Sequence, residues 1–162
     1  MIGPLPLRLR PMLLNRTNRI LAASFLALAA SLPPALAQSD PLASAAAESG
    51  AVVTPSGLVY RAVKEGKGAS PTATDTVKVH YRGTFPDGRE FDSSYKRNKP
   101  ASFPLNRVIK CWTEGLQRMK VGGTARLTCP AAIAYGEKGA GGGEIPPGAV
   151  LRFEVELLAI NP

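Results

Sequence analysis

The residue pattern from Leu58 to Ile160 predicts an α+β fold, with one short helix on one face of an antiparallel sheet of about four to six strands. Most of this stretch alternates apolar and polar residues, which is typical of strands with one buried and one exposed face. Only residues 108–123 repeat their apolar residues at helical spacing. One short helix among several such strands is the expected make-up of an α+β domain.

The strand pattern occurs in four main segments. In chain order they are "LVYRAVKEG" (58–66), "DTVKVHYRGTF" (75–85), "VGGTARLTC" (121–129) and "LRFEVELLAI" (151–160). Each shows the period of two that places alternate side chains on opposite faces of a sheet. The turn residues Pro86-Asp87-Gly88 then join the second segment to a further short strand arm.

The helical segment is "VIKCWTEGLQRMKVGG". Val108, Trp112, Leu116 and Met119 recur at intervals of four, four and three, which places them on one helical face. Gly122 and Gly123 follow as a C-terminal cap. We therefore expect this face to be buried against the sheet.

The N-terminal residues have the three parts of a secretory signal peptide. Four arginines form a basic head, residues 20–32 are apolar, and Ala35-Leu36-Ala37 offers a small-x-small cleavage site. The alternative is an uncleaved membrane anchor, but the apolar run falls short of the roughly 20 residues that span a bilayer. We expect a signal peptide over 1–37, a flexible segment over 38–56, and no stable membrane insertion after cleavage.

The charge of the chain indicates a solvated surface and no nucleic-acid site. The formal net charge is +8, and removal of the four N-terminal arginines lowers it to +4. The remaining lysines and arginines are scattered and are not interleaved with aromatic residues.

The sequence lacks the residue sets of several catalytic chemistries. It has one histidine, His80, on the exposed side of its strand, and no G-x-S-x-G motif for a serine nucleophile. One histidine and two cysteines do not make a structural zinc site. The glycine-rich residues 136–143 fit neither phosphate-binding glycine motif. We expect no metal and no cofactor.

Four motifs, taken in order, resemble the FKBP-type peptidyl-prolyl cis–trans isomerases, in particular the exported bacterial type. They are "VHYRGTFPDGREFDSSYKRNKP", "VIKCWTEGLQRMKVGG", "AYG" and "IPPGAVLRFEVELL". The resemblance spans residues 57–160. It implies an isomerase domain over 57–162, folded as a five- to six-stranded antiparallel sheet wrapped around one short α-helix.

The resemblance also implies a pocket for proline between helix and sheet. The residues expected to bind substrate are Tyr81, Phe91, Phe103, Val108, Ile109, Trp112, Tyr135, Ile145 and Phe153. The Ile109 N–H and the Tyr135 hydroxyl would hold substrate carbonyls. Asp92 would either order the pocket with Arg97 and Tyr81 or interact with the twisted carbonyl; a buried carboxylate needs partners, so we favour ordering. Residues 135–147 would form a flap beside this pocket.

The two cysteines, Cys111 and Cys129, are expected to form a disulfide. The strand alternation places Cys129 on the face that the helix covers, and Cys111 lies at the start of that helix. Export supplies an oxidising compartment. Two buried free thiols remain the alternative.

The expected function is acceleration of X-Pro bond rotation during the folding of exported proteins, in the periplasm or outside the cell. Partners would be proline-containing unfolded or extended polypeptides, and the macrolides that inhibit this family. A chaperone-like or peptide-binding module with little isomerase activity is the alternative. The sequence shows no appended dimerisation helix, which favours a monomer.

Overall fold

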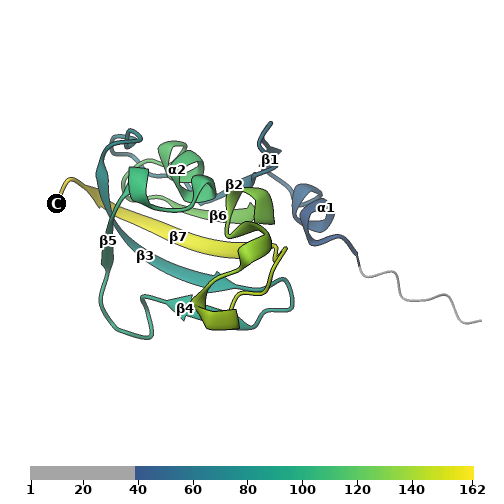
Figure 1. Cartoon of the computed structure of the whole chain (residues 1–162). Coiled ribbons are helices and arrows are strands. Elements are labelled where there is room, and N and C mark those ends of the chain that lie inside the picture. Colours follow the sequence, from purple (N-terminus) through teal and green to yellow (C-terminus); the bar gives the residue numbers. More distant parts are fainter. Residues whose placement is uncertain (1–38) are drawn as a thin grey trace, which may run out of the picture. The chain divides into compact units, whose positions relative to one another are not determined.

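An antiparallel sheet that curves around the helix α2 dominates the computed structural model, which describes residues 39–162 (Figure 1). Within these residues the sheet has seven strands: β1 (Ala51–Val53), β2 (Val59–Lys64), β3 (Thr76–Thr84), β4 (Glu90–Ser93), β5 (Ala101–Pro104), β6 (Thr124–Cys129) and β7 (Leu151–Ile160). The helices are α1 (Pro41–Ala46) and α2 (Lys110–Gln117), with short 3-10 turns η1 (Leu105–Arg107), η2 (Ala131–Ile133), η3 (Gly136–Lys138) and η4 (Gly141–Gly143). The predicted α+β class is therefore confirmed.

The strand order is β1-β2-β6-β7-β3-β4, and the short strand β5 also pairs with β3. The predicted alternation holds in β3, where Val77, Val79 and Tyr81 are buried. It holds also in β7, where Phe153 and Val155 are buried. These two central strands pair along almost their whole length, so their buried side chains form the floor on which α2 packs.

Within the segment 38–56, which the sequence led us to expect as flexible, the structure has the helix α1 and the strand β1. Asp40 caps α1 by accepting a hydrogen bond from the Leu42 N–H at 2.9 Å, and a proline follows at the first helical position. After α1, β1 pairs with β2. Glu48 forms a salt bridge of 2.9 Å with Arg61 on β2, which fixes this segment to the sheet.

The helix α2 is shorter than predicted. It ends at Gln117, and Gly122 lies in the following turn with a φ of 86°, where its N–H donates to the Leu157 carbonyl at 2.8 Å. Gly115 brings α2 close to the sheet, because a Cβ at this position would lie 2.7 Å from the Leu127 side chain on β6. Close helix–sheet packing therefore needs glycine here.

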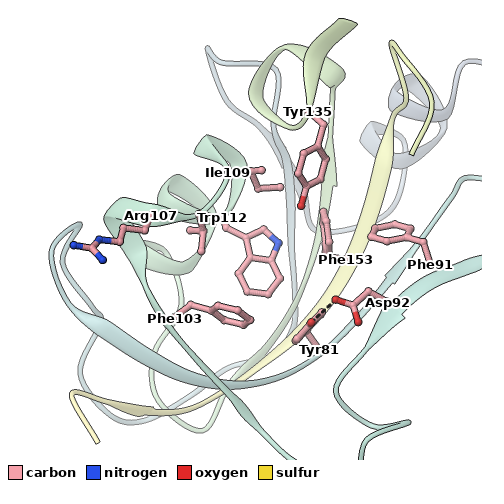
Figure 2. A pocket seen from close by; sticks show the side chains of 10 residues that line it. Tyr81, Phe91, Asp92, Phe103, Arg107, Ile109, Trp112, Tyr135 and Phe153 are labelled. Carbon is pink, nitrogen blue, oxygen red and sulfur yellow. Dashed lines mark hydrogen bonds between the residues drawn. The ribbon is translucent and has the colours of Figure 1, made fainter. Parts of the chain in front are cut away.

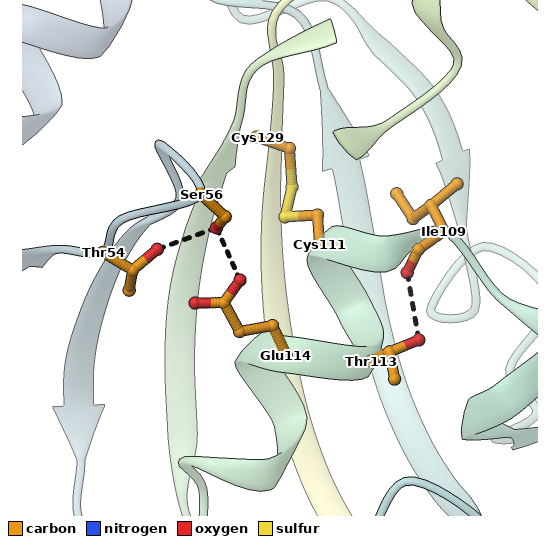
Figure 3. The surroundings of a disulfide bond; sticks show 7 residues. All are labelled: Thr54, Ser56, Ile109, Cys111, Thr113, Glu114 and Cys129. Carbon is orange, nitrogen blue, oxygen red and sulfur yellow. Dashed lines mark hydrogen bonds between the residues drawn. A yellow bond between two sulfur atoms is a disulfide. The ribbon is translucent and has the colours of Figure 1, made fainter. Parts of the chain in front are cut away.

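A disulfide joins the start of α2 to β6 (Figure 3). The Cα atoms of Cys111 and Cys129 are 5.9 Å apart, and both residues are fully buried. The pair that the strand alternation placed on facing sides of the helix–sheet contact is thus bonded in the structure. It ties the N-terminal end of α2, which follows the N-cap residue Ile109, to the core.

The structure describes no helix, between residues 39 and 162, that is long and apolar enough to cross a membrane. The predicted signal peptide, residues 1–37, lies outside the described residues.

Candidate functional site: an aromatic pocket between helix and sheet

A cavity of about 300 Å³ opens between α2 and the sheet (Figure 2). Its lining comes from five parts of the chain: Tyr81, Phe91, Asp92, Phe103, Arg107, Val108, Ile109, Trp112, Tyr135 and Phe153. Most of these side chains are apolar or aromatic, and few polar groups face the space. Such a lining suits an apolar ligand that is oriented by a small number of hydrogen bonds.

Trp112 lies at the centre of the aromatic lining. Its ring meets those of Tyr81, Phe103 and Phe153 edge to face, with ring centroids 5.2, 5.5 and 5.4 Å away. Edge-to-face contacts are a favoured geometry for aromatic pairs, and they fix the orientation of each ring. Trp112 is only 5% exposed, and its indole N–H has no hydrogen-bond partner among residues 39–162. The aromatic rings therefore hold one another in place and form the floor of the pocket.

A glycine opposite the pocket wall makes room for Phe91. Gly83 on β3 pairs with Phe153 on β7. A Cβ at Gly83 would lie 2.6 Å from the Phe91 ring and 3.1 Å from the Phe153 ring. The missing side chain lets these two rings meet edge to face with centroids 5.7 Å apart.

The carboxylate of Asp92 belongs to a closed hydrogen-bond triangle at the pocket edge. The Tyr81 hydroxyl donates to Asp92, and Arg97 donates both to Asp92 Oδ1 at 2.6 Å and to the Tyr81 hydroxyl at 2.8 Å. Burial is the largest influence on the Asp92 pKa and would raise it, but the hydrogen bonds from Tyr81 and Arg97 together outweigh it. The pKa of Asp92 is therefore lowered from its ordinary value, which favours the ionised carboxylate.

Two hydrogen-bond donors are available to a ligand. Ile109 is the N-cap residue of α2, and its backbone N–H donates to no acceptor within the described part of the chain. Tyr135 is 38% exposed, and its hydroxyl points into the pocket (Figure 2). Burial, followed by the Asp92 charge, raises the Tyr135 pKa, so this hydroxyl keeps its proton. Both groups can therefore donate hydrogen bonds to carbonyl oxygens of a ligand.

Comparison with known proteins identifies the family to which this pocket belongs. Residues 67–158 match the family described as FKBP-type peptidyl-prolyl cis-trans isomerase. The chain belongs to this family. The predicted resemblance is thereby confirmed.

Relatives and solved structures agree with this assignment. FkpA of Aeromonas hydrophila, an FKBP-type isomerase, is 56% identical over 120 residues, covering 74% of this chain and 44% of the relative. The FKBP-type 22 kDa isomerase of Escherichia coli is 53% identical over 107 residues, covering 66% of this chain and 52% of the relative. The chain thus spans about half the length of these curated relatives. The crystal structure of Escherichia coli FkpA superposes with a TM-score of 0.71 at 48% identity, covering 75% of this chain and 56% of that one.

The FKBP-type domain brings most of the predicted site residues together. Tyr81, Phe91, Asp92, Phe103, Val108, Ile109, Trp112, Tyr135 and Phe153 all line the one cavity. Arg97 does not line it and instead holds Asp92 and Tyr81. Ile145 is not among the lining residues; it is 6% exposed and belongs to the core.

Ile145 instead anchors the flap. Its backbone exchanges two hydrogen bonds with Ala140, at 3.0 and 3.1 Å, and closes a tight loop around η4. Gly139 has a φ of 64°, and a Cβ on it would lie 2.1 Å from the Ile145 carbonyl oxygen. Glycine is therefore required at this position for the flap to fold back on itself.

The sequence interpretation missed one lining residue, Arg107. It ends η1 just before Val108, and its guanidinium points away from Trp112 (Figure 2). Its position next to the "VI" motif was the available signal. A charged residue beside an apolar motif is more often a solvated one, so the sequence alone did not distinguish it.

Proposed function

We propose that this domain is an enzyme that accelerates cis–trans isomerisation of X-Pro peptide bonds in extended or unfolded polypeptides. The observation that carries the proposal is the aromatic pocket with two free donors in its lining, the Ile109 N–H and the Tyr135 hydroxyl. A proline ring is apolar and fits such a floor, while the flanking carbonyls require donors. Membership of the isomerase family supports the same conclusion.

The chemistry needs no nucleophile and no proton transfer. The barrier of about 18–20 kcal/mol comes from amide resonance, and rotation breaks no covalent bond. The planar amide is more polar than the twisted one, so an apolar pocket around Trp112 favours the twisted form. The Ile109 N–H and the Tyr135 hydroxyl orient the substrate by holding its carbonyls, and thereby position the rotating bond over the floor.

The direct test is an isomerisation assay on a short X-Pro-Phe peptide. Its readout is the rate of exchange between the cis and trans signals in NMR spectra. The purified domain should increase the exchange rate catalytically. A folded domain that leaves the uncatalysed rate unchanged would end the proposal. A proline-limited refolding assay on a whole protein then separates isomerisation from chaperone-like holding, since holding alone delays aggregation without shortening the slow phase.

Asp92 has a positioning role in this proposal. Asp92→Asn keeps the size of the side chain and removes its charge, so we expect kcat/KM to fall by only about threefold to tenfold, the cost of weakening one or two charge-assisted hydrogen bonds. Tyr81→Phe, which removes the donor to the same carboxylate, should cost a similar factor. In the double variant the two losses should not add, because both act through one triangle.

A direct role of the Asp92 charge at the rotating carbonyl predicts a different pattern. Asp92→Asn would then cost far more than Tyr81→Phe, and the losses would be independent. Either result is read from peptide exchange rates at saturating and subsaturating substrate.

The pH dependence of the reaction should be flat. The pKa of Asp92 is lowered from its ordinary value, and the pKa values of Tyr81 and Tyr135 are both raised from theirs, mainly by burial. We therefore expect constant kcat/KM between about pH 5 and pH 9. The stabilising contribution of Asp92 is present above about pH 4 and disappears as pH falls through its lowered folded pKa. A rise or fall of kcat/KM within this pH range would mean that another titrating group takes part in the reaction.

The compartment we propose is the periplasm or the extracellular space, with the domain acting as a monomer. The Cys111–Cys129 disulfide supports an oxidising compartment. Export itself is tested by N-terminal sequencing of the protein from its native host, which should begin at Gln38.

The pocket is also expected to bind the macrolide inhibitors of the family, but less tightly than relatives that have apolar contacts at the positions of Ala101 and Glu144. Ala101 on β5 packs against the core without lining the cavity, and Glu144 in the flap is exposed. Neither side chain adds apolar contact to a ligand. Ala101→Phe should tighten macrolide binding by about tenfold, as expected for part of a buried aromatic side chain. Macrolide affinity is measured by titration of Trp112 fluorescence. If Ala101→Phe leaves the affinity unchanged, Ala101 is not the cause of the weaker binding.

A further inference from the structure

A second cavity, of about 330 Å³, lies on the sheet face opposite the aromatic pocket. It is lined by Arg82, Thr84, Gly88, Arg126, Arg152 and Glu154. On β7, Arg152 and Glu154 alternate with the buried Phe153 and Val155, so they point away from α2. The cavity is therefore separate from the proposed proline site and is as large.

Three arginines from three neighbouring strands meet in this cavity. Arg126 is on β6, Arg152 on β7 and Arg82 on β3, and these strands are adjacent in the sheet. Arg82 and Arg126 lie on either side of Glu154 in one cross-strand row. The only carboxylate in the lining is that of Glu154, so the lining side chains carry an excess of two positive charges.

Two of the arginines already have acidic partners. Arg82 pairs with Glu90 at 2.8 Å, and Arg126 contacts Glu154 at 3.4 Å and Glu48 at 3.3 Å. The carboxylates outside the lining are shared with further cations, because Glu90 also pairs with Lys96 and Glu48 also pairs with Arg61. These pairs therefore do not remove the positive excess.

Arg152 differs from its two neighbours. Among residues 39–162 it forms no salt bridge, and its buried Nε has no hydrogen-bond acceptor. A buried N–H without an acceptor is costly, and a guanidinium presents paired donors in a planar fork that matches two oxygens of one anion. Arg152 thus brings to the cavity a guanidinium that no carboxylate of residues 39–162 pairs with, and a guanidinium is the type of group that binds oxyanions.

We propose that this cavity is an oxyanion site that binds a phosphate group, with Arg152 as its principal ligand and Arg82 and Arg126 at its sides. A phosphate dianion matches the excess of two positive charges in the lining, whereas a carboxylate supplies only one negative charge. The volume also leaves room for an organic group that carries the phosphate. The phosphate could belong to a soluble phosphate ester or to a lipid headgroup.

Titration with inorganic phosphate tests the proposal, in Tris buffer at low ionic strength. The readouts are calorimetric heat and the NMR signal of the Arg152 Nε–H. Phosphate should shift this signal saturably, and Arg152→Gln should weaken binding by about tenfold or more. Arg118→Gln is the matched control, because Arg118 pairs with Glu114 on α2, on the other side of the sheet, and should leave phosphate affinity unchanged.

Three results would overturn the site: a shift no greater than sodium chloride gives at the same ionic strength, equal phosphate affinity in Arg152→Gln, or tighter binding of succinate than of phosphate. Vesicles distinguish the two sources. Binding to phosphatidylcholine vesicles that contain phosphatidic acid, lost in Arg152→Gln, supports a lipid headgroup. Binding of free phosphate without vesicle binding supports a soluble phosphate ester.

Discussion

Replacing Trp112 by alanine should reduce kcat/KM for X-Pro isomerisation by about 10- to 100-fold. The indole forms the floor on which Tyr81, Phe103 and Phe153 pack, so its removal admits water into the pocket and frees the three rings. A loss of about 1.4–2.7 kcal/mol of apolar contact with the proline ring and its surroundings corresponds to that factor. Peptide exchange NMR on the purified variant measures it.

The control for this variant must separate a loss of catalytic activity from a loss of folding stability. Leu116→Ala also truncates a fully buried side chain on α2, one turn further along, but Leu116 does not line the cavity. Each variant should lose about 2–5 kcal/mol of unfolding free energy. Only Trp112→Ala should lose activity under conditions where both are folded. Equal activity in the two variants would contradict the role of the indole as the floor.

Removal of the Cys111–Cys129 disulfide should lower the free energy of unfolding by about 3 kcal/mol. The bond closes a loop with a sequence separation of 18, and in the chain-entropy model the gain comes from restricting the unfolded chain. Urea denaturation of the oxidised protein, with and without reductant, measures the loss. Both sulfurs are fully buried, so reduction requires prior local opening.

The double variant Cys111→Ala/Cys129→Ala provides the control, because its unfolding midpoint should not respond to reductant. Reduction should also loosen the start of α2, because Cys111 and Ile109 are neighbours there (Figure 3). The Ile109 N–H would then be held less firmly. An oxidised and a reduced protein with the same midpoint would contradict the stabilising role of the bond.

The fold class could be predicted from the sequence because the residue patterns that indicate strands and helix each lie within a short stretch of the chain. The alternation in β3 and β7 and the helical spacing of Trp112 and Leu116 each lie within a dozen residues. The place of the flap residue Ile145 in the core could not be predicted, because a motif gives its position in the chain and not its backbone hydrogen bonds to Ala140. α1 and β1 escaped prediction since both are very short and small residues dominate α1.

The arginine cavity could not be predicted from the sequence at all. Arg82, Arg126 and Arg152 are far apart in the chain, and each looks like an ordinary exposed strand residue. Only the strand order β6-β7-β3 and its register bring them together. The lack of an acceptor for Arg152 is likewise a property of the packed structure.

The short strand β1 has a protective consequence for the whole sheet. It occupies the edge next to β2, and its own edge is only three residues long. A chain trimmed to begin at residue 57 would leave the backbone N–H and C=O groups of β2 open to solvent, beside the exposed side chain of Val63. Such an edge is a template for pairing with other chains. The segment from Asp40 to Val53 therefore covers the first half of this edge, and we expect a shortened domain to pair with other chains more readily than the longer one.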